Sequence, residues 1–178
     1  GKFDGGFHTL TVAYEGKGQA TAPFNQVAGA TIENLKTAGT IKQTGTSGNY
    51  PQSHASGLVG SANVVTINNC EVAVAISYTR TDDHHSAGFV GHGQGSVITM
   101  NNCKFSGSFT APTGTKSSGI AGLVGWSAGT GSSFTNCYVA GTYTNIVDVH
   151  PLVYTTSNKV TVNSSNNFYC FKDITAST

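Results

Sequence analysis

The sequence is poor in charge and in strong helix formers. Only 10 % of its 178 residues are Asp, Glu, Lys or Arg, and the formal net charge is +1. A chain with neither a basic stripe nor an acidic tail lacks the electrostatic signature of nucleic-acid binding, so we expect no nucleic-acid partner. Leu, Glu and Lys are scarce, whereas Gly, Thr, Ser, Asn and Val are frequent. This composition favours strands and turns over helices.

Long apolar runs are also missing. No segment approaches the roughly 18–20 apolar residues that span a bilayer, so we expect no membrane insertion of this segment. The sequence shows no signal peptide, and it opens on Gly1 without a methionine, so we expect the native protein to be longer and to contain adjoining domains. Low charge with abundant Ser, Thr and Asn is typical of a secreted or surface-displayed bacterial domain.

The dominant positive feature is a repeat of about 33 residues, a period that indicates a stacked architecture. Each copy ends in Asn followed by an apolar residue, and in three copies a Gly-rich anchor precedes this motif. The Asn motifs are Asn34-Leu35, Asn69-Cys70, Asn102-Cys103 and Asn136-Cys137, with a looser copy at Asn167-Phe168, and the anchors are Gly57–Gly60, Gly88–Gly91 and Gly122–Gly125.

The residues after each Asn motif alternate strictly. Cys70, Val72, Val74 and Ile76 share one parity, as expected for a strand with one buried face. About three short strands per repeat, stacked on their neighbours, predict an all-β, right-handed parallel β-solenoid of about five to six rungs. We expect a single domain over 1–178, with an N-terminal capping rung at 1–21, regular repeats at 22–145 and a divergent C-terminal rung at 146–178. Segments of variable length at 42–54, 78–86 and 111–119 should emerge together on one edge.

Stacking assigns structural roles to the repeated residues. The column Ile32, Ile67, Met100 and Phe134 should point inward. The asparagines should occupy a corner, because Asn tolerates the left-handed conformation and its amide can bond the Asn of the next rung. Cysteine alternates with Leu and Phe in its column, which predicts free buried thiols rather than a zinc site or disulfides.

The Ala/Ser-Gly-Leu/Phe-Val-Gly anchor with its later Asn-Cys resembles the GLUG-motif repeats of bacterial surface proteins. The opening Phe3-Asp4-Gly5-Gly6-Phe7-His8 resembles the segment that often precedes such repeats, and the similarity covers most of residues 3–145. The resemblance implies an extracellular, cell-surface location and an adhesin-like or scaffold role within a larger protein. It implies no catalytic residues.

Histidines form the best candidate cluster for chemistry. His54 and His85 each lie three residues before an anchor glycine, so stacking should place them on adjacent rungs at one edge. Asp82, Asp83 and His84 neighbour His85, and His92 follows the anchor. Imidazole with carboxylate could hold a divalent metal or form a pH-sensitive patch, and the alternative is a solvated loop.

Outward aromatic residues are the candidates for ligand binding. Tyr138 and Tyr169 each follow an Asn motif closely and should share one outward column, and Trp126 follows an anchor directly, where we expect it at an exposed rim. Such residues could stack on sugar rings, and the alternative is that they simply cover the sheet. A host or microbial glycan, or a surface protein, is therefore the expected class of partner.

The sequence offers little for catalysis. It contains no Gly-x-Ser-x-Gly elbow, P-loop or zinc-protease motif. Solenoid glycosidases and lyases need convergent carboxylates. Of the eight acids only Asp82 and Asp83 are neighbours, and we expect no two others to share a column on adjacent rungs. We therefore predict a non-enzymatic, adhesin-like structural domain without a cofactor, and the alternative is a carbohydrate-binding module or a hydrolase-associated domain.

Overall fold

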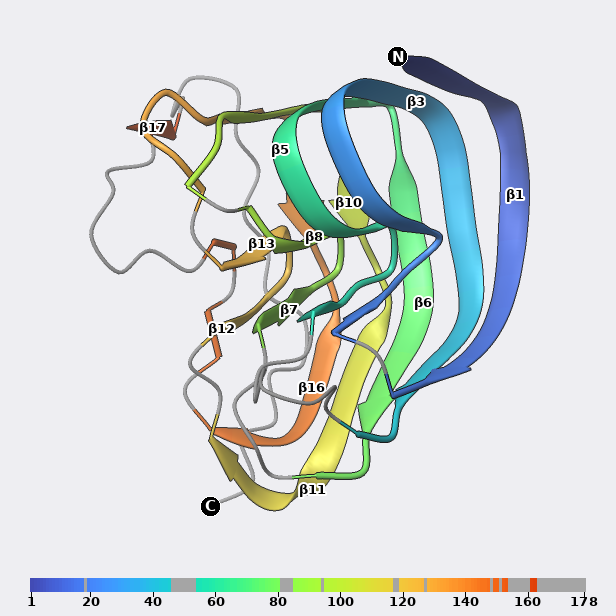
Figure 1. The fold of residues 1–178 in the computed structure, drawn as a ribbon, viewed down its shortest axis with the longest axis vertical. Helices are drawn as coiled ribbons and strands as arrows, with labels where there is room; N and C mark the ends of the chain where they lie inside the picture. The colour runs from blue at the N-terminus through green and yellow to red at the C-terminus, as the bar shows by residue number, and fades with distance from the viewer. Residues whose placement is uncertain are drawn as a thin grey trace.

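A computed structural model describes residues 1–17, 19–45, 54–80, 85–93, 95–116, 119–126, 128–147, 149–150, 152–153 and 161–162. Over these residues the protein is all-β, without a helix, and its parallel strands stack as a β-solenoid of about three turns (Figure 1). The predicted all-β solenoid built from stacked repeats is therefore confirmed.

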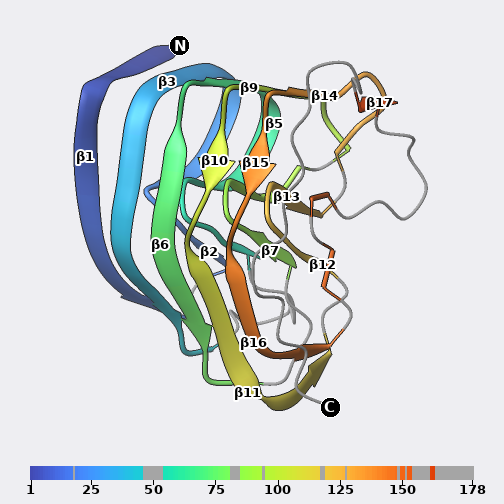
Figure 2. The same ribbon diagram turned by 180° about the vertical axis from the view of Figure 1, so that it is seen from behind.

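The longest face of the solenoid follows the Asn corner. Its neighbouring strands lie side by side in Figure 2 and pair in parallel register. They are β1 (Lys2–Gly16), the second half of β3 (Phe24–Gln43), β6 (Glu71–Tyr78), β10 (Lys104–Phe105) with β11 (Ser108–Lys116), and β15 (Tyr138–Val139) with β16 (Thr142–Val147).

A second face precedes the Asn corner, and a third carries the Gly-rich anchors. The second face joins the first half of β3 to β5 (Val59–Asn68), β9 (Ile98–Asn101), β14 (Ser133–Thr135) and β17 (Thr161–Val162). The third face holds β2 (Ala20–Thr21), β4 (His54–Ala55), β7 (His85–Ala87) and β12 (Gly119–Ala121). Across the anchor, β8 (Val90–His92) pairs with the start of β5, and β13 (Val124–Trp126) pairs with β8.

The predicted asparagine ladder is confirmed at the corner. Asn34, Asn69, Asn102 and Asn136 all have positive φ, between 51° and 54°. Each side-chain amide donates to the Asn Oδ1 of the preceding rung over 3.0–3.1 Å. The first rung ends the ladder differently, because Asn34 Nδ2 donates to Asp4 Oδ1 at 3.1 Å. Asn combines a low cost in the left-handed region with a side chain that satisfies its neighbour.

The inward columns form one continuous core. Ile32, Ile67, Met100 and Phe134 are in register and at most 2 % exposed, as predicted. Cys70, Cys103 and Cys137 are buried free thiols, which confirms the thiol column for these three; Cys170 lies outside the described residues. Each thiol points at the carbonyl oxygen two residues earlier, 3.2–3.4 Å away, so the cysteines act as small apolar residues with one weak donor.

The expected insertion at 111–119 is present over 111–114, but it lies inside a strand, because β11 has four residues between Thr110 and Thr115 where β16 has one between Thr144 and Ile146. Strand β11 continues to Lys116 and, after a register shift between Thr110 and Thr115, pairs with β16. Gly114, whose φ is +82°, lies in this irregular segment, and the ladder continues beyond it. In the other two insertions, residues 46–53 and 81–84 lie outside the described residues.

Candidate functional site

Two side-chain columns meet on either side of the Gly-rich anchor. The first contains Ala20, His54, His85 and Gly119, the opening residues of β2, β4, β7 and β12; the Ser56–Ala87 bridge fixes His54 and His85 in equivalent positions. The second contains Ser61, His92 and Trp126, from β5, β8 and β13. The apolar residue inside each anchor turn, Leu58, Phe89 or Leu123, is fully buried.

The rings of the two columns interleave diagonally. His92 stacks on His54 of the preceding rung, with centroids 4.5 Å apart and an interplanar angle of 21°. Trp126 stacks in the same way on His85, at 4.2 Å and 9°. The ring centroids of His54 and His85 are 5.8 Å apart, and those of His85 and His92 are 5.9 Å apart. One residue from each of three strands thus converges on a single histidine cluster.

The cluster is buried, which goes against the alternative of a solvated loop for His54, His85 and His92. His54 and His85 are only 6 % and 5 % exposed, and His92 is half-buried. Burial, with smaller effects from His92 and His85, lowers the pKa of His54 to about 3. Burial and the nearby His85 lower the pKa of His92 to about 4. Both imidazoles are therefore neutral near pH 7, with one ring nitrogen carrying a lone pair.

The three histidines are also a potential ligand set. One ring nitrogen from each of His54, His85 and His92 lies within 4.8 Å of the other two. The predicted adjacency of His54 and His85 is confirmed, and His92 joins them. Asp82 and Asp83, the expected carboxylate partners, lie outside the described residues. The signal for His92 was its place one residue after an anchor, where Ser61 and Trp126 stand in the neighbouring copies.

The predicted aromatic face is not assembled by the described residues. Trp126 is half-buried against His85 rather than fully exposed at a rim. Tyr138 ends an outward column that begins with Thr9 and continues with three charged residues, Lys36, Glu71 and Lys104. In that column Glu71 contacts Lys36 at 3.3 Å and Lys104 at 3.5 Å. Tyr169 lies outside the described residues.

The acidic residues require one correction. Asp4 and Glu33 are register partners on adjacent strands, contrary to the expectation that no two such acids share a column. Their contacts are structural, because Asp4 accepts from Gly6 N and Asn34 Nδ2 and Glu33 contacts Lys2 Nζ at 2.7 Å. The Gly6 N–H, and then the Asn34 amide, lower the pKa of Asp4, which is the opposite of what a general acid needs.

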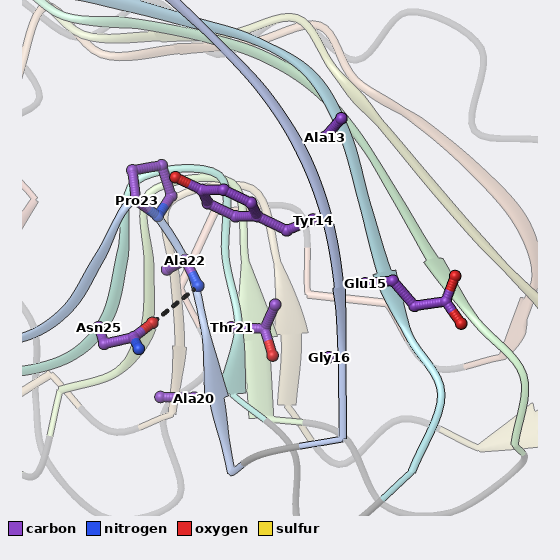
Figure 3. Close-up of a pocket in the computed structure, with 9 residues that line it drawn as sticks. All are labelled: Ala13, Tyr14, Glu15, Gly16, Ala20, Thr21, Ala22, Pro23 and Asn25. Atoms are coloured by element: carbon purple, nitrogen blue, oxygen red, sulfur yellow. Dashed lines mark hydrogen bonds between the residues drawn. The ribbon is translucent and has the colours of Figure 1, made fainter.

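A cavity of about 630 Å³ lies between the end of β1 and the residues around β2. Tyr14, Ala22 and Pro23 lie along it, whereas the Glu15 carboxylate points away from them (Figure 3). Glu15 contacts Lys42 Nζ at 3.6 Å on the neighbouring strand. The other polar side chains of the lining already bond within the protein, because Thr21 Oγ1 donates to Gln43 Oε1 at 2.8 Å and Asn25 Oδ1 accepts from Ala22 N at 3.1 Å. The cavity therefore does not show a set of polar groups that converge on a ligand.

Comparison of the chain with protein-family models, curated proteins and solved structures finds no match. The similarity to GLUG-motif repeats therefore rests on the motif residues alone. Within the described part of the chain, no helix is long and apolar enough to cross a membrane.

Proposed function

We propose that this chain is a non-enzymatic, adhesin-like structural repeat domain of a bacterial cell-surface protein, located outside the cell. One observation carries the proposal: the asparagines and cysteines that recur in the sequence make structural contacts within the stack of rungs. The asparagines bond one another along the corner, and the cysteines pack in the core. Repetition in this chain therefore serves stacking, which is what a spacer or display domain requires.

The anchor glycines support the same conclusion. A Cβ on Gly88 would overlap the Gly122 carbonyl oxygen and the Phe105 ring, and one on Gly125 would overlap the Ser86 carbonyl oxygen. These glycines allow adjacent rungs to approach closely, so they are packing positions rather than a phosphate-binding loop. The extracellular location depends on the GLUG resemblance and on the low-charge composition.

The finer architecture belongs to this proposal. The strands of the longest face come from five successive copies, namely β1, β3, β6, β11 and β16, which supports a complete solenoid of five to six rungs once residues 146–178 are included. Right-handed coiling follows from the general preference of parallel crossover connections.

The exposed side chains of strand β1, at the N-terminal end of the solenoid, support the proposal that an adjoining domain contacts the first rung. Strand β1 exposes Phe7, Leu10 and Tyr14, whose exposed fractions are 77 %, 38 % and 40 %. Among the described strands β1 pairs only with β3, and an exposed edge with apolar side chains favours contact with another protein surface. Other domains of the parent chain are the partners proposed here, with a host or microbial surface molecule as the target of the whole protein.

Two measurements test the proposal. Protease treatment of intact bacteria that express the parent protein should remove an epitope within this domain, and protection of that epitope until lysis would refute the surface location. The purified domain should give no turnover on a panel of polysaccharides and no signal on a glycan array. Array binding that is lost in Tyr138→Ala and kept in Tyr14→Ala, the matched exposed tyrosine, would replace the spacer role with carbohydrate recognition.

A further inference from the structure

The geometry points to a metal site at the histidine cluster: we propose that His54, His85 and His92 bind one divalent transition-metal ion of the Zn²⁺ type. The site lies beside the anchor turns of consecutive rungs. It adds a ligand to a domain whose proposed role is structural, and neither inference depends on the other.

The first argument is that the three histidine nitrogens need to move only a short distance to coordinate one metal ion. Because the three nitrogens lie within 4.8 Å of one another, some point lies within about 2.8 Å of all three, which is 4.8 Å divided by √3. Zinc–imidazole bonds measure roughly 2.0–2.1 Å. Each nitrogen must therefore move by about 0.7 Å or less, together with a tilt of the near-parallel rings so that their lone pairs converge. Side-chain rotation supplies such a movement without a change in the ladder register.

The second argument is the placement of the histidines along the columns. Elsewhere in the described parts of these columns the residues are Ala20 and Gly119 on one side and Ser61 and Trp126 on the other. Small or apolar residues therefore satisfy the packing of this fold. Histidine occurs only at the three positions where the two columns bring polar ring atoms together, which is where a metal needs them.

The third argument is the chemistry of the donors. Three buried or half-buried imidazoles suit Zn²⁺, Cu²⁺ and Ni²⁺, whereas Ca²⁺ and Mg²⁺ require oxygen ligands. Three protein ligands leave a fourth coordination position for water or an external group. The surroundings hold the cluster in place, because Trp126 stacks on His85 and a Cβ at Gly119 would lie 3.0 Å from Cδ2 of the same ring.

The test is isothermal titration of ZnCl₂ into the chain, prepared without a histidine tag and freed of metal with EDTA. We expect one equivalent to bind, and His92→Ala to weaken the affinity by at least tenfold. His8→Ala, which removes an exposed histidine outside the cluster, should leave the affinity unchanged. The half-buried His92 is the ligand chosen for truncation because it is the least buried of the three, and circular dichroism checks that the variant folds.

Co²⁺ substitution gives a readout that requires no variant. Binding at the cluster should produce visible d–d bands of a nitrogen-ligated site without the near-ultraviolet charge-transfer band of a thiolate ligand. A thiolate band would assign the metal to the cysteine column and overturn the proposal. Absence of stoichiometric Zn²⁺ binding, or equal affinity in His92→Ala and the unsubstituted chain, would also overturn it.

Discussion

The asparagine ladder allows its backbone and side-chain contributions to stability to be separated at Asn102. This residue donates to Asn69 Oδ1 and accepts from Asn136 Nδ2, each over 3.0 Å, and its φ is +54°. Replacing it with Ala removes both amide bonds and also places an unfavourable residue in the left-handed region. Replacing it with Gly removes the same two bonds and leaves the backbone conformation accessible.

The expected magnitudes follow from these contacts. Two exposed hydrogen bonds contribute about 0.5 kcal/mol each, the low end of the usual range. Holding Ala in the left-handed backbone conformation at position 102 costs about 1 kcal/mol more. Asn102→Ala should therefore lower the free energy of unfolding by about 2 kcal/mol, and Asn102→Gly by about 1 kcal/mol. Asn101→Ala is the matched control, because it loses one ladder bond, to Asn68 at 2.9 Å, at a residue without positive φ, and should cost about 0.5 kcal/mol.

Urea unfolding measures these differences. The only tryptophan, Trp126, reports on the anchor columns by fluorescence, and far-ultraviolet circular dichroism reports on the strands. The two probes must give coincident transitions, because stacked repeats can unfold in parts. Equal destabilisation by Ala and Gly at position 102 would refute the backbone argument. Costs below the Asn101→Ala control would refute the ladder argument.

Three further results are expected. In metal-free protein, the free energy of unfolding should fall as pH drops below about 6.5, because His54 and His92 then bind protons in the unfolded state but, in the folded state, only near their lowered pKa values of about 3 and 4. Calorimetry should show a loss approaching ~1.4 kcal/mol per pH unit for each histidine. A flat profile down to pH 4 would contradict this expectation. Val64 has φ +58° and is 48 % exposed, so Val64→Gly should leave stability unchanged or raise it by up to ~1 kcal/mol. The control Val97→Gly, at an exposed residue without positive φ, should lower stability by about 1 kcal/mol. Thermal unfolding compares the two variants, and equal losses would refute backbone strain at Val64. Cys70, Cys103 and Cys137 are at most 3 % exposed, so a thiol reagent at pH 8 should label at most Cys170 in the native protein and all four cysteines in urea. Burial also raises the pKa of Cys70 to about 11, whereas the hydrogen bond with Cys103 lowers the pKa of Cys137, so the protection of Cys137 depends on its burial alone. Native labelling of more than one thiol would mean that the column is open to solvent.

The repeat itself was visible in the sequence because stacking forces equivalent residues into the same environment. Asn at every corner and an alternating strand after it follow from local backbone preferences, so the ladder, the inward columns and the free thiols of the described rungs could be predicted. The extension of β11 to Lys116 could not, because pairing with β16 resumes after a register shift that no local pattern indicates.

The sequence by itself determined the all-β solenoid, the role of the asparagines and the adjacency of His54 and His85, since each depends on repeat spacing. Tertiary structure decided the rest. His92 lies on the far side of the anchor turn, and only the fold of that turn brings its ring onto His54 and the Trp126 ring onto His85. Burial, which depends on how the rungs close around the core, removes this cluster from solvent and lowers the pKa values of His54 and His92.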